Sequence, residues 1–250
     1  MTKRKYKIRK DGRIKALIEG PWGPAGTIGG YIECEGNLAQ DGDCWVYDSA
    51  RVFGYARVTG NARIYDYAQV FGCATVASDA TIYNHAQLFG QATVTGGANV
   101  FGYTQVCASA EVAGKAWVTD SARVSGDAKV YGSAWVGGKS CVYGDARVSG
   151  KAKVYGKAWV YGNAVISGNV EVSGDVRVYG NAWVYGNAEI FGNAQVCDDA
   201  RVYDNAKVHG GAWVYADTQV CGDDRAYSDD VLRAMATVSS YVAETRRRYE

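Results

Sequence analysis

The chain has 250 residues, of which 32 are glycine and 2 are proline, and its formal net charge is +1 at pH 7. A nearly neutral chain lacks the charge excess typical of proteins that bind nucleic acids, and no apolar run is long enough to form a transmembrane helix. We therefore expect neither a nucleic-acid partner nor a membrane partner. The seven cysteines form no CxxC pair and show no disulfide-like spacing, which favours reduced thiols in a cytoplasmic protein.

Residues 1–45 are expected to form a basic hairpin and a cap. Residues 3–15 hold eight basic residues against Asp11. This excess indicates either an arm that binds an anion or a nucleic acid, or a solvated strand edge, and we favour the strand edge. Asp11 and Gly12 predict the turn of the hairpin. Residues 16–45 lie outside the regular register described below, and a segment of this kind can block edge pairing at the open end of a repeat.

From Val46 to Val220 an aliphatic residue recurs at every sixth position, at thirty positions in all. A small residue stands two positions before most of them, and Gly, Asp or Asn stands two positions after. A period of six does not match the repeat of a helix. It does match a short strand, whose alternate residues point inward, followed by a turn. Glycine, and to a lesser degree Asp and Asn, adopts the positive φ that such a turn requires. Residues 46–222 are therefore predicted to form one repeat domain.

A second period, of 18 residues, indicates three strands per coil. The residues that directly follow the aliphatic positions occupy the corners of the coil and sort into columns. One column reads Tyr47, Tyr65, Tyr83 and Phe101, the next reads Phe53, Phe71 and Phe89, and the third reads Thr59, Ala77, Thr95 and Ala113. Stacked coils with two aromatic corners and one small corner explain this sorting, whereas a six-residue repeat alone does not. Thirty strands make about ten coils.

The six-residue pattern resembles that of the hexapeptide-repeat proteins. The opening segments Gly12–Leu17, Ala25–Glu33 and Asn37–Asp48 more closely resemble YdcK-type repeat proteins of bacteria and phages, although Gly20–Pro24 departs from their usual pattern. The resemblance implies a left-handed triangular parallel β-helix. Together with the six-residue pattern, it leads us to expect an all-β fold in which residues 1–45 form an N-terminal cap. Such proteins are commonly described as transferases, and similar β-helix families form trimers.

The residue before each aliphatic position is expected to point outward, and these residues form three faces. The first face carries Trp45, Arg63, Thr81, Asn99, Trp117, Trp135, Lys153, Glu171, Glu189 and Lys207. The second face carries Arg51, Gln69, Gln87, Gln105, Arg123, Cys141, Trp159, Arg177, Gln195 and Trp213. The third face carries Arg57, Thr75, Thr93, Glu111, Lys129, Arg147, Val165, Trp183, Arg201 and Gln219. Six tryptophans are thus predicted to lie outside the core. Trp is enriched in binding surfaces, and stacking between neighbouring coils is the alternative.

Two of these tryptophans predict an oligomer. Trp117 and Trp135 lie 18 residues apart on the first face, and we expect them to form the interface of a homo-oligomer with closed symmetry. A trimer is the state that similar β-helix families imply.

Residues 223–250 are predicted to form an amphipathic C-terminal helix. Ser228 is a suitable N-cap, Asp229 and Asp230 suit the positive end of the helix dipole, and Arg246–Arg248 suit the negative end. Val231 and the residues that follow it at helical spacing form one apolar stripe. The helix would cover the last coil or pack against a neighbouring subunit.

No catalytic residue, metal site or cofactor is predicted. Hexapeptide-repeat acyltransferases use a histidine as a general base beside a protruding loop, and the two histidines here, His85 and His209, have no such loop beside them. A general base needs a substrate pocket within reach, which within this chain would arise only between subunits. The cysteines and histidines do not converge as zinc ligands.

We therefore expect a non-catalytic binding or scaffold protein whose ligand is a planar, anionic small molecule such as a nucleotide, or a protein partner. In a phage setting such a protein could sequester a signalling nucleotide of the host. The expected site lies on the second face and its flanking corner, and it consists of Arg123, Tyr143, Trp159, Tyr161, Arg177 and Tyr179. Aromatic rings would stack on the ligand, and arginine would bind its phosphate. Arg147, Trp183 and Arg201 of the third face are the next candidates. An acyltransferase and a structural spacer or virion component are the alternative functions.

Overall fold

The computed structural model describes residues 4–227 and 231–232. It divides into two compact units, Met1–Gly126 and Asp127–Glu250, and each is described by itself. Both consist of short strands wound as successive coils of a parallel β-solenoid, with about 11 turns in the chain, so the all-β prediction is confirmed. The described residues contain a single short helix, the 3₁₀ turn η1 (Glu35–Asn37). The left-handed winding that the resemblance implies remains an expectation.

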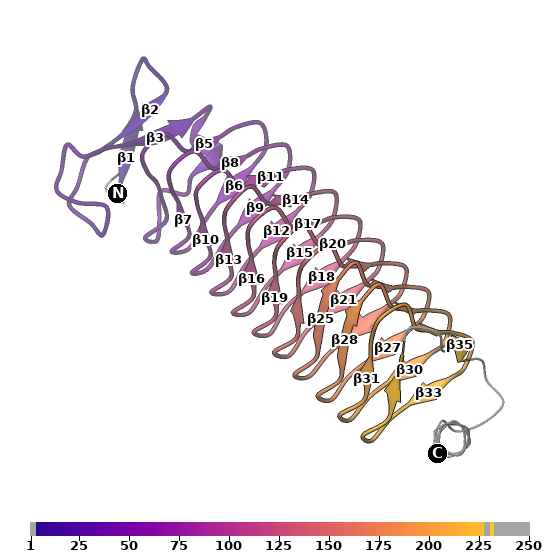
Figure 1. Cartoon of the computed structure of the whole chain (residues 1–250). Helices are drawn as coiled ribbons and strands as arrows, with labels where there is room; N and C mark the ends of the chain where they lie inside the picture. The colour runs from indigo at the N-terminus through magenta and orange to yellow at the C-terminus, as the bar shows by residue number, and fades with distance from the viewer. Residues whose placement is uncertain (1–3, 228–230, 233–250) are drawn as a thin grey trace, which may run out of the picture. The chain divides into compact units, whose positions relative to one another are not determined.

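In the first unit the strands stack in three sheets that correspond to the three predicted faces (Figure 1). The first-face strands are β4 (Trp45–Val46), β7 (Arg63–Ile64), β10 (Thr81–Ile82), β13 (Asn99–Val100) and β16 (Trp117–Val118). The second-face strands are β1 (Tyr6–Ile8), β2 (Arg13–Ala16), β3 (Ile28–Ile32), β5 (Arg51–Val52), β8 (Gln69–Val70), β11 (Gln87–Leu88), β14 (Gln105–Val106) and β17 (Arg123–Val124). The third-face strands are β6 (Arg57–Val58), β9 (Thr75–Val76), β12 (Thr93–Val94) and β15 (Glu111–Val112).

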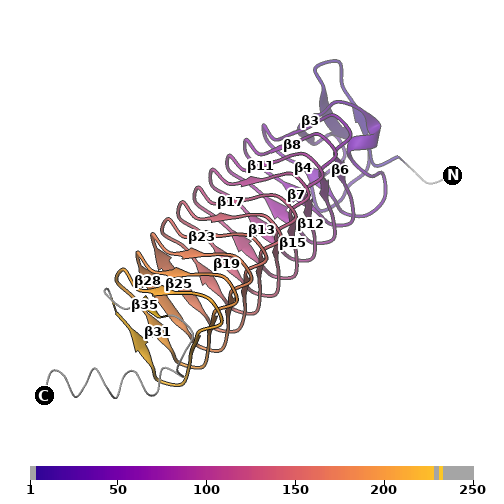
Figure 2. The same cartoon turned by 90° about the vertical axis from the view of Figure 1, so that its right-hand side faces the viewer.

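The second unit repeats this arrangement, and Figure 2 shows its first-face strands side by side. These are β19 (Trp135–Val136), β22 (Lys153–Val154), β25 (Glu171–Gly174), β28 (Glu189–Gly192), β31 (Lys207–Val208) and β34 (Arg225–Ala226). The second-face strands are β20 (Cys141–Val142), β23 (Trp159–Val160), β26 (Arg177–Val178), β29 (Gln195–Val196), β32 (Trp213–Val214) and β35 (Val231–Leu232). The third-face strands are β18 (Lys129–Val130), β21 (Arg147–Val148), β24 (Val165–Ile166), β27 (Trp183–Val184), β30 (Arg201–Val202) and β33 (Gln219–Val220).

Paired residues on neighbouring coils lie 18 positions apart, as the sequence predicts. Trp159 on β23, for example, pairs with Arg177 on β26. The backbone amide of Trp159 donates to the carbonyl of Val176 at 2.8 Å, so each coil is held to the next along its length. The small and aliphatic positions, such as Ala164 and Ile166, are fully buried and form the core. Because each coil buries its inner face against the next, stability is close to a sum over neighbouring coils.

The turn residues adopt the positive φ that the pattern predicts. Gly54 has a φ of 66°, and Asp66 and Asn84, at equivalent positions, have φ values of 57° and 58°. Asp at this position also joins neighbouring coils, because its carboxylate accepts a hydrogen bond from the next coil. The Oδ2 atom of Asp66 accepts from the amide of Asn84 at 2.9 Å. Asp therefore offsets part of its conformational cost with a hydrogen bond that glycine cannot make.

The predicted corner columns form stacked aromatic ladders. In the first unit, Tyr47 stacks on Tyr65 with ring centres 4.3 Å apart. Phe71 stacks on Phe53 at 5.0 Å and on Phe89 at 5.1 Å. These separations match the spacing of about 4.8 Å between neighbouring strands, so the rings stack because the coils do.

Residues 6–16 form the predicted hairpin and extend the second-face sheet. Strands β1 and β2 pair antiparallel, and Gly12 in the turn between them has a φ of 80°. Strand β2 pairs antiparallel with β3, and β3 pairs parallel with β5. The edge of β5 is thereby paired with β3.

Two side chains in this region lie inside the protein, contrary to the sequence interpretation. Trp45 is 0% exposed, because its ring stacks on Trp22 with ring centres 4.8 Å apart and contacts the ring of Tyr6 edge-on at 6.3 Å. The prediction that all six tryptophans lie outside the core is therefore wrong for Trp45. Lys5 is 2% exposed and not part of a solvated strand edge. Its Nζ donates to the carbonyl oxygens of Asp41, Gly42 and Cys44 at 3.3, 3.2 and 3.0 Å.

The predicted C-terminal helix needs one correction. Val231 and Leu232 form β35, which pairs in parallel with Trp213 and Val214 of β32. A helix beginning at Ser228 is therefore wrong at these two residues, because the strand succession continues through them. Ala226 and Leu232 in fact continue the six-residue spacing after Val220. The rest of the predicted helix lies outside the described residues.

Candidate functional site

Five of the six predicted site residues lie together in the second unit. Trp159 on β23 and Arg177 on β26 are direct neighbours on adjacent coils of the second face. Trp159 is 46% exposed although Trp is strongly apolar, and Arg177 is also exposed. The ring of Tyr143, at the flanking corner, contacts Trp159 edge-on, with ring centres 6.0 Å apart. The arrangement offers an aromatic surface next to a fixed positive charge.

The tyrosine column beside this pair is continuous. Tyr161 stacks on Tyr143 at 4.9 Å and on Tyr179 at 5.0 Å, so both faces of its ring are covered. Burial raises the pKa of Tyr143, and the nearby Arg177 charge acts in the opposite direction. The pKa of Tyr179 is also raised, chiefly by burial. The raised pKa values keep the phenols of Tyr143 and Tyr179 neutral at physiological pH, so these two groups can donate hydrogen bonds at the edge of the column. A ligand ring cannot enter between the stacked rings.

Arg123, the sixth predicted residue, lies on β17 of the first unit. It is exposed, and its Nη2 lies 4.0 Å from the Sγ of Cys107. Arg123 and the Trp159–Arg177 pair thus belong to different units.

A hollow on the third face of the second unit repeats the pairing of Trp with Arg. It has a volume of about 290 Å³ and is lined by Ser167, Trp183, Tyr185 and Arg201. We call it the third-face hollow. Trp183 and Arg201 are direct neighbours on β27 and β30, and Trp183 is 52% exposed. Sequence reasoning named Trp183 and Arg201 but missed Ser167 and Tyr185. The sequence could have identified both residues, because they lie 18 positions apart in one corner column, and that column changes from serine to tyrosine between them.

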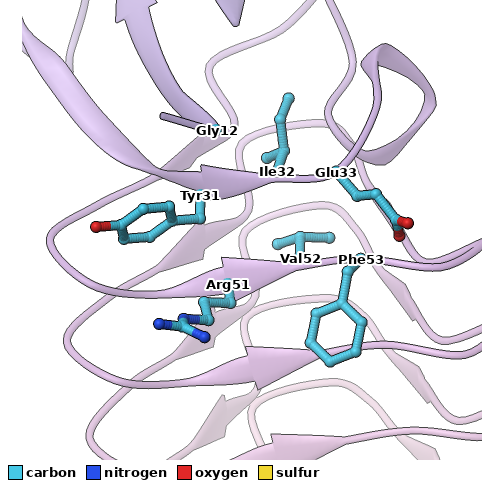
Figure 3. Close-up of a pocket in the computed structure, with 7 residues that line it drawn as sticks. All are labelled: Gly12, Tyr31, Ile32, Glu33, Arg51, Val52 and Phe53. Atoms are coloured by element: carbon cyan, nitrogen blue, oxygen red, sulfur yellow. The ribbon is translucent and has the colours of Figure 1, made fainter. Parts of the chain in front are cut away.

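A second hollow, of about 430 Å³, lies in the first unit beside β3 and β5 (Figure 3). Figure 3 shows Tyr31 and Arg51 on one side of it and Glu33 and Phe53 on the other. The guanidinium carbons of Arg51 and of Arg13 each lie 5.4 Å from the ring centre of Tyr31. The carboxylate of Glu33 accepts from the amide of Gly54 at 2.6 Å. Because these charged groups already contact groups of the chain, we rank this hollow below the third-face hollow as an anion site.

Both histidines are built into aromatic ladders. The ring of His85 stacks between Tyr67 at 5.2 Å and Tyr103 at 4.9 Å. His209 stacks on Phe191 at 4.9 Å, and the ring of Tyr227 meets it edge-on at 4.2 Å. Both imidazoles therefore pack against aromatic rings of the chain.

The two tryptophans of the predicted interface fall in different units. Trp117 in the first unit is 46% exposed and contacts the ring of Phe101 edge-on at 5.8 Å. Trp135 in the second unit is half-buried, and its ring contacts that of Tyr155 in a tilted arrangement, with ring centres 5.6 Å apart. Of the pair, Trp117 offers the larger free apolar surface.

These features define a parallel β-solenoid of the repeat type with exposed Trp–Arg pairs. A family model described as the YdcK beta solenoid repeat matches residues 122–138, 170–186 and 194–210. These three segments are thus similar to YdcK-type repeats, and the resemblance found in the sequence is confirmed. The segment 170–186 includes Arg177, Trp183 and Tyr185, so part of both Trp–Arg surfaces lies within a family repeat.

The chain is also similar to a protein of Escherichia coli (strain K12) that is named an uncharacterized acetyltransferase, YdcK. The two are 55% identical over 40 residues, which is 16% of this chain and 12% of that protein. The matched stretch thus spans about an eighth of the relative's length. In the part of the chain that the structure describes, no helix combines the length and apolar character needed to cross a membrane.

Proposed function

We propose that this chain is a non-catalytic binding protein that holds a planar, anionic small molecule, such as a nucleotide, on the second unit. The proposal rests on one observation that occurs twice. An exposed Trp stands beside an exposed Arg on the adjacent coil, at Trp159–Arg177 and at Trp183–Arg201. Stacking of a base on an aromatic side chain contributes about 1–3 kcal/mol, and arginine can bind a phosphate through two parallel hydrogen bonds. Sequestration of such a molecule is the biological role that fits this chemistry.

The alternative explanation of each pair is a cation–π contact between its own Arg and Trp, with no ligand involved. An exposed cation–π contact between Arg and Trp would contribute only about 0.5–1 kcal/mol. Neither Trp159 nor Trp183 has its ring beneath an arginine, because the cation–π contacts of the described residues are at Trp22 and Tyr31. The two indoles therefore keep ring surface available for a ligand.

Binding is expected to depend on these two tryptophans. Wild-type protein should bind AMP or GMP in titration calorimetry, and the double variant Trp159→Ala/Trp183→Ala should not bind at measurable affinity, because both stacking surfaces are removed. Trp159→Ala with Arg177→Ala tests the second face alone. Trp213→Ala removes a similarly exposed tryptophan of the second unit that pairs with Gln195 and Val231 and not with an arginine, and this control should bind as wild type does. Absence of AMP and GMP binding by the wild-type protein would refute the proposal.

We further propose that the protein is a homotrimer that uses Trp117 and Trp135. Exposed Trp is favoured at protein interfaces, and Trp117 is nearly half exposed. Light scattering should give three times the chain mass at micromolar concentration, and Trp117→Ala with Trp135→Ala should shift the protein toward the monomer. A monomeric wild-type protein at that concentration would exclude this assembly.

An acetyltransferase is the second candidate, because the relative from E. coli carries that name. His85 and His209 would be the general bases, and each would have to leave its ring stack to take a proton from a substrate. Steady turnover of acetyl-CoA that is lost in His85→Ala or His209→Ala would favour this function over the binding protein. A protein that shows neither nucleotide binding nor turnover would instead fit a structural spacer or virion component.

A further inference from the structure

The third-face hollow lies where an aromatic column of the second unit is interrupted. The corner column that borders the third face contains Tyr131, Ser149, Ser167, Tyr185 and Tyr203. Tyr185 and Tyr203 stack in parallel, with ring centres 5.0 Å apart and planes inclined by 2°. The next position in the column is Ser167, whose side chain has no ring. Among the described residues, the only ring that stacks on Tyr185 is that of Tyr203, so the ladder ends at the hollow.

The continuous column of the same unit shows what is missing. In that column Tyr143, Tyr161 and Tyr179 occupy three successive coils without a gap. At the third-face corner, serine in place of tyrosine removes one ring from the stack. Ser149, one coil further along, is only 8% exposed, so its neighbours already cover it. Ser167 is more exposed and lines the hollow. The stack on Tyr185 therefore lacks a ring at Ser167, and the hollow lies there.

A planar ligand ring would restore the spacing of the ladder. Rings in the filled columns lie 4.9–5.0 Å apart, within the range in which aromatic pairs attract each other. A ring placed over Ser167 at that separation would stack on the free face of Tyr185. Trp183, which lines the same hollow, would border the ring.

The charges around the hollow favour an anion. The outward residues of the third face in the second unit are Lys129, Arg147, Val165, Trp183, Arg201 and Gln219. They include three basic side chains and no carboxylate. Arg201 lines the hollow itself, and no carboxylate forms an ion pair with it among the described residues. A phosphate carried by the same ligand as the stacked ring could therefore bind the guanidinium of Arg201.

We propose that the gap at Ser167 is a binding subsite for the aromatic ring of a nucleoside monophosphate. The base takes the place of the missing tyrosine ring, stacks on Tyr185 and lies beside Trp183, and the phosphate binds Arg201. This inference rests on the proposed function and assigns the ligand to the third face in preference to the Trp159–Arg177 pair.

Filling the gap provides the test. Ser167→Tyr supplies the missing ring and so blocks the site. The Kd for AMP and for GMP should rise by about 5- to 150-fold, the factor that corresponds to the loss of one stacked base. Ser167→Ala leaves the gap open and should bind within about twofold of wild type. Arg201→Ala should weaken binding of AMP and leave binding of adenosine, which has no phosphate, almost unchanged. Titration calorimetry measures all four proteins.

A second measurement does not depend on a ligand. Because a new tyrosine would continue the ladder of Tyr185 and Tyr203, Ser167→Tyr should raise the melting temperature of the ligand-free protein by a few degrees. A lower melting temperature would show that the gap does not accept a ring and would overturn the inference.

The outcomes separate this inference from the proposed function. If the wild-type protein binds AMP or GMP, Ser167→Tyr keeps full affinity and Trp159→Ala loses it, the second face is the site and only the inference fails. If the wild-type protein binds neither nucleotide, both the inference and the proposed function fail. If Ser167→Tyr instead disrupts self-association, the ring that fills the gap comes from another copy of the chain, and the inference is wrong.

Discussion

Replacing Trp45 with alanine should destabilise the first unit by about 3–5 kcal/mol, the range observed when a large buried aromatic residue is truncated. Trp45 is fully buried, and its ring fills the space between Trp22 and Tyr6. Its removal would leave a cavity where the cap meets the first coil. Urea unfolding followed by tryptophan fluorescence measures the loss.

Trp117→Ala is the matched control, since Trp117 occupies the same register position on the first face but is nearly half exposed. Apart from any stability lost with the proposed trimer interface, it should cost no more than about 1 kcal/mol, because surface substitutions usually have small effects. Trp45→Phe should cost less than Trp45→Ala. The indole Nε1 of Trp45 has no hydrogen-bond acceptor in the described part of the chain, and phenylalanine removes that unpaired donor. Equal stabilities of Trp45→Ala and Trp117→Ala would contradict the buried position of Trp45.

Substituting Lys5 is expected to have the second large effect. Its Nζ donates to three backbone carbonyl groups in the segment Asp41–Cys44, and the bond to the carbonyl of Cys44 is buried. Lys5→Met keeps the length of the side chain but leaves the buried carbonyl of Cys44 unpaired. A buried unpaired group costs about 1–3 kcal/mol, and a loss in this range is expected, measured by urea unfolding. Hydrogen exchange in β1 and β2 should accelerate, because Lys5 attaches the hairpin to the first coil.

The control for Lys5 lies two residues away on the same hairpin. Lys7 belongs to β1 and is exposed, and it pairs with Lys15 of β2. Lys7→Ala should change stability by no more than about 0.5 kcal/mol. It could even stabilise the hairpin slightly, since like charges directly opposite each other on paired strands repel. A Lys5→Met variant as stable as Lys7→Ala would show that Lys5 is not required to hold the cap.

The repeat could be predicted from the sequence because its stabilising contacts recur at fixed separations. Every coil contacts residues 18 positions away, so the same environment returns at each step and selects the same residue type. Val46 and its equivalents, the corner rings such as Tyr47 and Tyr65, and the turn residues such as Asp66 all show this. The hairpin turn at Gly12 was equally predictable, because a turn is determined by a few adjacent residues.

The tertiary structure alone decided what breaks this periodicity. Trp45 and Trp117 share a register position, yet only Trp45 is buried, because Trp22 and Tyr6 of the N-terminal segment pack against it. Lys5 is buried for a similar reason, as the carbonyl groups of Asp41–Cys44 converge on it. No repeat marks these contacts in the sequence, because each occurs once. The third-face hollow was predictable in part from the repeat and was decided in part by tertiary packing. The serine at position 167 is plain in its column, but whether neighbouring side chains fill the resulting gap, as they do at Ser149, depends on the packing of the folded coils.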